Sequence, residues 1–300
     1  MRLGVARPTA VVDVSGLSTR IDEAESGVLR IGAGVRNSDL AADIRVRRSY
    51  PALSQALLSG ASGQLRNMAT IGGNLLQRTR CFYFQDVSKP CNKRQPGSGC
   101  PARNGIHRDL AVLGTSLSCI ATHPSDMAVA LAALDAVVLV QGPNGTRRLT
   151  LDEFYRLPGD DPTRDTTVQH GELITSVELP APSAISVASG YRKVRDRASY
   201  AFAVGSVAAA LTVTGGVVQD VRLAFGAVAP RPWRARIAES SIRGGPVTAA
   251  AFAEAIEAEF GQAEPLPDNA FKIPLVRNLG TAVLLDIAAA GDEPDTGGAS

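Results

Sequence analysis

The sequence has 300 residues, 45% of them hydrophobic, which is enough for one large domain or two of ordinary size. Lysine and arginine total 31 against 29 for aspartate and glutamate, so the net charge of +2 gives no support for a nucleic-acid or membrane-surface role. The sequence shows no long uninterrupted apolar run and no export signal at its start. We therefore expect a polypeptide that is cytoplasmic as synthesised.

Short strands and helices alternate in the first part of the chain. Residues 11–14 and 28–35 are predicted to be strands. Residues 38–43 follow a polar helix cap and are predicted to be a helix. A helix over 51–58 begins with a proline and ends at the glycines of 60–63. The predicted strand at 11–14 has no earlier element with which to pair.

The middle of the chain carries clear cap and turn signals. Ser125 can cap a helix that runs to about residue 134, with Asp126 in its positively polarised first turn. The G-P-N-G turn at 142–145 predicts a hairpin. The elements expected around and after this turn are strands over 136–140 and 147–151, a short helix over 151–155, an exposed loop over 158–169 and a strand over 173–179.

The proline-rich break at 180–183 is our candidate domain boundary. It divides the chain into residues 1–181 and 182–290, and leaves 291–300 as a flexible tail. Strands followed by helices indicate an α+β second domain. We expect strands over 186–194, 204–213 and 217–228, and helices over 232–240, 247–260 and 273–288.

All four cysteines of the chain lie between residues 81 and 119, at positions 81, 91, 100 and 119. Thiols that served only as small core hydrophobes would be scattered. Structural zinc usually draws ligands from C-x-x-C pairs, and the sequence has none. Separate thiolates on a loop rich in glycine and proline suit the four corners of an iron–sulfur cube better. The spacing favours such a cluster and leaves zinc and unligated thiols open. Cations that would offset its charge are Lys89, Lys93, Arg94 and Arg103.

The segment T-I-G-G-N at 70–74 lies between apolar stretches. Glycine lets a backbone come close to a ligand phosphate, and Thr70 and Asn74 add side-chain donors. An ordinary turn is the alternative interpretation, because the G-x-G-x-x-G of a Rossmann nucleotide site is absent. Lys193, on a predicted strand, is either a solvated cation or a partner for an anionic ligand group.

These motifs carry a resemblance to a known family. Residues 64–74, Q-L-R-N-M-A-T-I-G-G-N, resemble the flavin-binding signature of the medium subunit of molybdenum hydroxylases, the xanthine dehydrogenase family. The cysteine segment, which ends in I-A-T-H-P-S-D-M at 120–127, is similar to the flavin subunits that carry an extra 4Fe-4S cluster. Among those it most resembles the subunits of bacterial periplasmic aldehyde oxidoreductases, and more distantly those of 4-hydroxybenzoyl-CoA reductases.

The resemblance covers nearly the whole chain and implies an α+β fold. An FAD-binding domain of the vanillyl-alcohol-oxidase (PCMH) type, with a 4Fe-4S insert at 80–120, would precede a C-terminal domain like that of CO dehydrogenase flavoproteins. By position, Thr70, Ile71, Gly72, Gly73 and Asn74 would contact the FAD pyrophosphate and ribitol. In the same way Asp126 would bind the adenosine side, Ile174 would pack on the cofactor and Lys193 would lie near the flavin. The cluster ligands would be Cys81, Cys91, Cys100 and Cys119.

The implied function is electron transfer within a heterotrimer. A large subunit with the molybdenum cofactor would oxidise an aldehyde, and a small 2Fe-2S subunit would pass the electrons through FAD to an external acceptor. We therefore expect no catalytic residue here. Subunits of this kind are exported on a partner's signal, so a periplasmic location stands beside the cytoplasmic one. Two alternatives stay open, a hydroxybenzoyl-CoA reductase-like flavin subunit and a zinc-stapled scaffold without a redox role.

One departure from the family pattern concerns the start of the sequence. Family members carry a first FAD loop of the A-G-G-T-[ND]-L-L type ahead of the strand that residues 11–14 resemble, and this sequence begins just after that point. Either the true start lies upstream or this form lacks half of its pyrophosphate site. The loop would supply several hydrogen bonds to charged oxygens, each worth roughly 1.5 to 3 kcal/mol.

Overall fold

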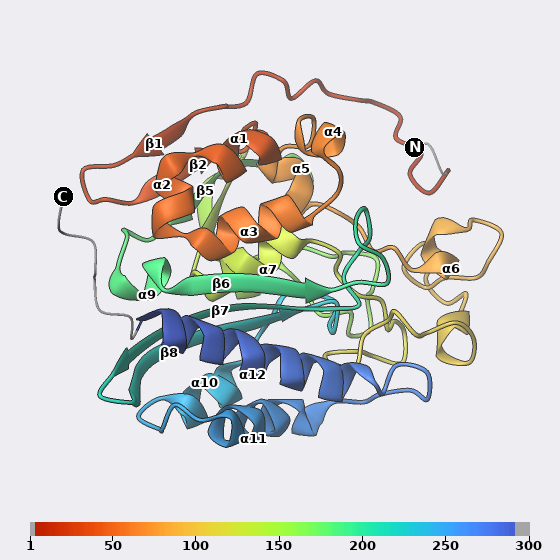
Figure 1. Ribbon diagram of the computed structural model, residues 1–300. Helices are drawn as coiled ribbons and strands as arrows, with labels where there is room; N and C mark the ends of the chain where they lie inside the picture. Colours follow the sequence, from red (N-terminus) through yellow and green to blue (C-terminus); the bar gives the residue numbers. More distant parts are fainter. Residues whose placement is uncertain (1–3, 292–300) are drawn as a thin grey trace.

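The computed structural model describes residues 4–291, which form two antiparallel sheets with helices between and beside them (Figure 1). Helices α3 and α7 lie between the sheets, where they contact the strands of the second sheet. Helices α10, α11 and α12 cover the other face of that sheet. The mixed helix and sheet content confirms the α+β fold class.

The first sheet has the strand order β1-β2-β5-β3-β4, and every neighbouring pair is antiparallel. Strand β5 is central because it pairs with β2 on one side and with the β3–β4 hairpin on the other. The predicted hairpin turn and the predicted strand at 173–179 are both confirmed. The strands are β1 Ile21–Glu23, β2 Leu29–Gly32, β3 Val137–Gly142, β4 Gly145–Thr150 and β5 Leu173–Leu179.

The second sheet has the order β6-β7-β8-β9 and is also antiparallel throughout. Its long strands alternate side chains between two buried faces, one against α3 and α7 and one against α12. The buried apolar residues therefore form two large clusters, one between the two sheets and one between the second sheet and the outer helices. The strands are β6 Ser189–Val194, β7 Gly205–Thr214, β8 Val217–Gly226 and β9 Trp233–Arg234.

The helices form where the sequence supplies caps and apolar faces. Ser125 accepts a hydrogen bond from the Ala128 amide at 3.0 Å and caps α7, all of whose residues are buried. Pro51 opens α3 in its first turn, as expected. The helices of the first half are α1 Asn37–Ala42, α2 Ile44–Ser49, α3 Pro51–Ser59, α4 Gly63–Arg66, α5 Ile71–Leu75, α6 Phe82–Gln85, η1 Pro101–Arg103, α7 Asp126–Ala133 and α8 Leu151–Phe154. Those of the second half are α9 Ala184–Val187, α10 Arg236–Ile242, α11 Ala249–Glu259, η2 Phe260–Gln262 and α12 Lys272–Gly291.

Four local predictions were wrong. Residues 11–14 form no strand, and Val11 and Val12 are 75% and 76% exposed, because no strand lies beside them in the described chain. The T-I-G-G-N segment is the one-turn helix α5 rather than a turn. Residues 184–187 are helical, so β6 begins later than expected, and the chain pairs as β9 before α10 begins. The predicted tail, residues 291–300, lies outside the described residues apart from the last residue of α12.

Helix α12 is long and apolar enough to cross a membrane by length and composition alone. It packs instead against β6, β7 and α11, with Val276 and Leu284 buried in the core of the second sheet. Core helices of globular proteins can be equally long and apolar. The packing of α12 in the core therefore explains its composition.

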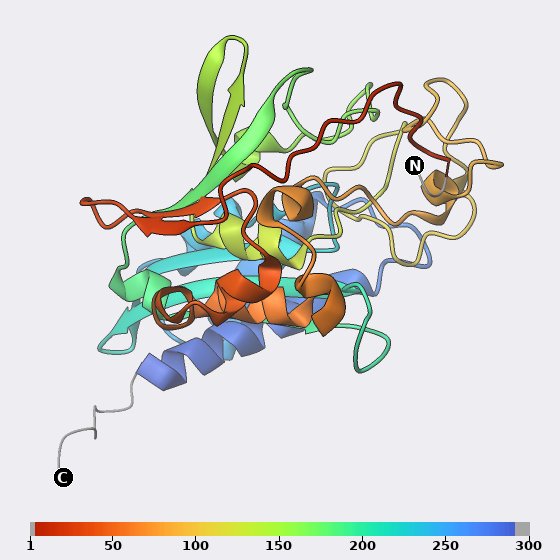
Figure 2. The same cartoon turned by 90° about the horizontal axis from the view of Figure 1, so that it is seen from above.

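The cysteine segment projects to one side of the two sheets. Figures 1 and 2 both show residues 80–120 as a group of loops around α6, outside the layered core. The segment contains only short helices, and a small apolar cluster of its own includes Cys81, Phe84, Cys119 and Ile120. Loops without regular secondary structure lose conformational entropy when they become ordered. The burial of these apolar side chains offsets part of that loss.

Candidate functional site

Helix α5 presents one closed side and one open side. The Thr70 hydroxyl accepts a hydrogen bond from the Gly73 amide at 3.3 Å and caps the helix. Gly72 is buried against Ala33, where an added Cβ would lie 3.2 Å from the alanine Cβ. Gly73 is exposed, and an added Cβ would lie 3.2 Å from the Thr70 hydroxyl oxygen with no other atom within 4 Å. The backbone at Gly73 is therefore open to a ligand.

Asn74 connects α5 to the start of α7. The Ser125 hydroxyl donates to Asn74 Oδ1 at 2.7 Å, while Gln77 Nε2 donates to the same oxygen at 2.8 Å. Ser125 also caps α7, so one side chain joins the end of α5 to the start of α7. Ile174, on β5, is buried in the same apolar cluster as Ile71. It therefore belongs to the core and not to the exposed surface of the protein.

Asp126 and Lys193 form a buried ion pair. Lys193 Nζ lies 2.8 Å from Asp126 Oδ2, and their side chains are 3% and 8% exposed. The Tyr191 hydroxyl donates to Asp126 Oδ1 at 2.5 Å, and Lys193 Nζ also donates to the Ala201 carbonyl at 3.1 Å. Burial, with Asp126 beside it, raises the pKa of Tyr191 well above its usual value. The phenol is therefore a neutral donor to the carboxylate.

The structure thus brings Asn74 to Ser125 and Lys193 to Asp126, two adjacent positions at the start of α7, although Asn74 and Lys193 come from distant segments. Tyr191 was not predicted from the sequence to be a residue of the site. A signal for it exists, because residues two apart on a strand point to the same face, and Tyr191 stands two positions before Lys193 on β6.

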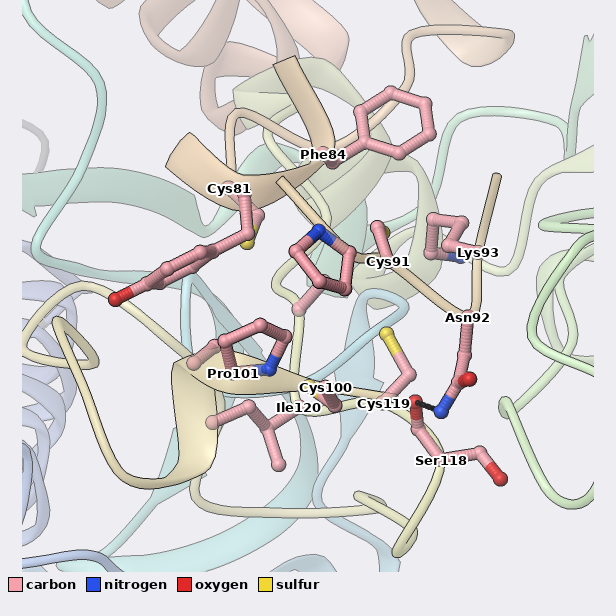
Figure 3. Close-up of a pocket in the computed structure, with 14 residues that line it drawn as sticks. Cys81, Phe84, Cys91, Asn92, Lys93, Cys100, Pro101, Ser118, Cys119 and Ile120 are labelled. Carbon is pink, nitrogen blue, oxygen red and sulfur yellow. Dashed lines mark hydrogen bonds between the residues drawn. The ribbon is translucent and has the colours of Figure 1, made fainter. Parts of the chain in front are cut away.

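The four cysteines line a single pocket (Figure 3). All four are free thiols, and Cys81 and Cys119 are buried. Cys81 immediately precedes α6, Cys100 immediately precedes η1, and Cys91 and Cys119 lie in loops. Each thiol reaches the pocket from a different part of the segment, as separate ligands of one group would.

Hydrogen bonds from side chains to backbone carbonyls hold these loops together. The Arg94 guanidinium donates to the carbonyls of Tyr83, at 2.5 Å, and Phe84, at 2.7 Å, and so ties the Cys91 loop to α6. Asn92 Nδ2 donates to the Ser118 carbonyl at 3.1 Å, next to Cys119. Side chains within three residues of Cys91 therefore set the positions of the segments that carry the other thiols.

Burial and the neighbouring thiols both affect the pKa values of the cysteines. Burial raises the pKa values of Cys81, Cys100 and Cys119, the last to about 11. After burial, Cys91 and Cys100 add to the upward shift at Cys81, and Cys100 and Cys81 add to the one at Cys119. Lys93 acts in the opposite direction and lowers the pKa of Cys119. A cationic metal group bound to the thiolates would offset this mutual repulsion.

Within the described residues, no three or more His, Cys, Asp or Glu side chains are placed to hold a single metal ion. The donor set is nonetheless purely thiol, and soft thiolates are the ligands of iron–sulfur groups. Four thiols that face one pocket from separate loops fit a ligand with four separate corners.

Comparison with known proteins agrees with this architecture. Residues 1–182 match the family model described as the FAD binding domain in molybdopterin dehydrogenase, and 189–286 match the CO dehydrogenase flavoprotein C-terminal domain. The chain is 51% identical over 292 residues to the aldehyde oxidoreductase FAD-binding subunit PaoB of Escherichia coli K12, covering 96% of this chain and 88% of that subunit. It is also 27% identical over 246 residues to the glyceraldehyde dehydrogenase medium chain of Sulfolobus acidocaldarius, covering 81% of this chain and 69% of that one.

Solved structures of low identity share the fold. Quinoline 2-oxidoreductase from Pseudomonas putida 86 aligns with a TM-score of 0.71 at 22% identity, covering 97% of this chain and 86% of that chain. Carbon monoxide dehydrogenase from Hydrogenophaga pseudoflava aligns with a TM-score of 0.64 at 22% identity, covering 91% and 78%.

The chain belongs to the family of FAD-binding subunits of molybdopterin dehydrogenases, the molybdenum hydroxylase family. It is a subunit of an oxidoreductase of the aldehyde oxidoreductase and xanthine dehydrogenase type. The resemblance found in the sequence and the fold that it implied are confirmed.

Proposed function

We propose that this chain is the electron-transferring flavin subunit of a molybdenum-containing aldehyde oxidoreductase. The observation that carries the proposal is the 51% identity with the Escherichia coli aldehyde oxidoreductase subunit over 96% of this chain. The other relatives that we compare are less than 30% identical, so they support the family and not the substrate. The division of the chain at residues 181 and 182 and the insert at 80–120 are part of the same proposal.

The FAD contacts that we propose lie on α5, at the start of α7, and on β5 and β6. Residues 70–74 would contact the pyrophosphate and ribitol, with the open side of Gly73 nearest the cofactor. Asp126 would serve the adenosine side, Ile174 would support the cofactor from below and Lys193 would lie near the flavin. FAD, when bound, would supply the electron-transfer chemistry, taking electrons one at a time from an iron–sulfur partner. The chain's own residues hold and orient it.

The 4Fe-4S cluster is a further part of the proposal, with Cys81, Cys91, Cys100 and Cys119 as ligands. Two observations support it: the shared pocket and the free state of all four thiols. Cluster ligands must be deprotonated, and burial raises the pKa of Cys119 to about 11, so a cationic iron–sulfur core would have to displace the thiol proton there.

We propose two partner subunits, a large one with the molybdenum cofactor and a small one with 2Fe-2S clusters, and an external acceptor that takes electrons from this chain. Assembly before export, on a partner's signal, is the localisation that would accompany this arrangement. The relatives named above as FAD-binding subunit and medium chain are themselves parts of such multi-subunit enzymes, which supports the partners.

The first experiment is an anaerobic visible spectrum of the purified chain, with flavin, iron, acid-labile sulfide and zinc quantified. We expect flavin bands over a broad iron–sulfur absorbance, with about four iron and four sulfide per chain. Flavin without iron would reject the cluster and keep the flavin subunit. Zinc without iron or sulfide would leave only a stapled scaffold.

A second experiment separates the two enzyme classes. The complex co-purified with its partners should reduce an artificial acceptor when given aromatic or aliphatic aldehydes, and should not turn over aryl-CoA thioesters. Turnover of the thioesters alone would replace the aldehyde oxidoreductase assignment with a reductase in which electrons flow the other way.

A further inference from the structure

Lys93 is the cation among the side chains that line the cysteine pocket (Figure 3). Its side chain is only 6% exposed. Nζ donates to the Pro162 carbonyl at 2.9 Å and forms an ion pair with Asp165. Both partners lie in the loop between α8 and β5, so a residue from a different part of the chain fixes a charge beside the thiols.

Asp165 divides its carboxylate between two cations. Lys93 pairs with Oδ1, and Arg78 Nε lies 2.7 Å from Oδ2. Arg78 Nη2 also donates to the Thr163 carbonyl at 2.9 Å. The Arg78 side chain is 42% exposed, and water screens its charge, whereas the charge of Lys93 is buried. Asp165 therefore keeps Arg78 as a partner when Lys93 is changed, and Lys93 keeps the Pro162 carbonyl when Asp165 is changed.

The other cations of the segment are less able to act on the pocket. Lys89 is exposed, and the Arg94 guanidinium is directed to the carbonyls of α6 and of Lys89 rather than into the pocket. Arg103 Nη1 donates to the Ser116 carbonyl at 3.2 Å. Of these cations, Lys93 is the one that lines the pocket. Its charge is thus buried beside the thiols.

A negative charge added to the pocket would be stabilised by this buried ammonium. When an iron–sulfur cluster accepts one electron, its net charge becomes more negative by one, while no bond is formed and Lys93 keeps its proton. A buried ammonium favours the reduced form and raises the reduction potential, because the low-dielectric surroundings screen it poorly. A carboxylate beside the ammonium works against that effect.

We propose that Lys93 and Asp165 are positioning residues that together set the reduction potential of the cluster bound by the four cysteines. The inference rests on the proposed cluster and adds the residues that tune it. Lys93 raises the potential, and Asp165 both holds the ammonium in place and offsets part of its charge. The two residues therefore act with opposite signs, which a purely structural role in the segment would not produce.

The test is a redox titration of the full chain, in complex with its partners, followed by the electron paramagnetic resonance signal of the reduced cluster. Lys93→Met should lower the midpoint potential, and Asp165→Asn should raise it. We expect each change to alter the ratio of reduced to oxidised cluster at a fixed potential by about tenfold, or about 59 mV for one electron. Lys93→Arg should stay near the original value, and the exposed Lys89→Met is the matched control that should not shift.

The outcomes separate this inference from the cluster itself. Wild-type protein without iron and sulfide would overturn both. Full iron content with unchanged potentials in Lys93→Met and Asp165→Asn would overturn the inference and leave the cluster standing. If Lys93→Met loses its iron, Asp165→Asn decides alone, and an unchanged or lower potential in that variant overturns the proposal.

Discussion

Lys193 Nζ lies 2.8 Å from Asp126 Oδ2, and this pair joins β6 to the first turn of α7. Tyr191, from the same strand, donates to the other oxygen of the carboxylate at 2.5 Å. Both charges are inside the protein, so each depends on the other for its stabilisation. The contact also links the two parts of the chain that lie on either side of the break at 180–183.

The first prediction concerns this pair. Asp126→Asn or Lys193→Met alone leaves a buried charge without its partner and should lower the free energy of unfolding by about 3 to 5 kcal/mol. The double variant removes both charges and should recover a large part of that loss. Urea denaturation of the four proteins measures the coupling, and costs that simply add would contradict it. Arg192→Met is the control, because the Arg192–Asp286 pair is half exposed and should be worth less than about 1 kcal/mol.

The second prediction tests the open side of α5. Gly73→Ala should leave folding nearly unchanged or slightly more stable, because alanine is favoured over glycine in a helix by roughly 0.5 to 1 kcal/mol. Its methyl group points into the space proposed for FAD, so we expect FAD affinity to fall by at least about tenfold, or about 1.4 kcal/mol. Flavin fluorescence titration of the deflavinated complex measures it. Gly63→Ala, in α4 with nothing within 4 Å of the added Cβ, should bind FAD normally.

The third prediction concerns pH. Burial lowers the pKa of His123 from 6.5 to about 4, so the folded protein holds a neutral imidazole where the unfolded chain binds a proton. The stability contributed by this residue is complete above the unfolded pKa and is lost as pH falls toward the folded one. The loss between about pH 7 and about pH 5 should be about 2 kcal/mol.

Urea denaturation at the two pH values checks this dependence. His123→Gln should show a smaller decrease in stability over the same interval, whatever its stability at neutral pH. The exposed His170→Gln should decrease like the wild type. An equal slope in wild type and His123→Gln would show that other groups are responsible.

The fourth prediction concerns the cluster ligands. Cys91→Ser should abolish iron and sulfide binding and loosen the loops of residues 80–120, because a hydroxyl is a poor ligand for iron in such a group. Iron analysis and limited proteolysis measure the two effects. Ser118→Ala is the matched control, since Ser118 lines the pocket but contributes no thiol. Unchanged iron in Cys91→Ser would show that the ligand assignment is wrong.

Local elements of the fold could be predicted because their signals lie within a few residues of one another. The cap at Ser125, the proline that opens α3 and the G-P-N-G turn between β3 and β4 each act on their own neighbours. The four cysteines were likewise found from their concentration in one segment. The strand predicted at 11–14 was wrong because valine content favours a strand only when another strand lies beside it.

The sequence by itself determined the family, the α+β class and the residue types of the two candidate sites. Only the tertiary structure decided which of those residues meet. Asp126 and Lys193 are 67 positions apart, and Lys93 and Asp165 are 72 apart. Pairs so distant are formed by the packing of β6 against the central helices and by the course of the loop before β5, which bury charges that the sequence presents as ordinary surface residues. A charge that is buried can act on a neighbouring group, whereas the same charge in water is screened.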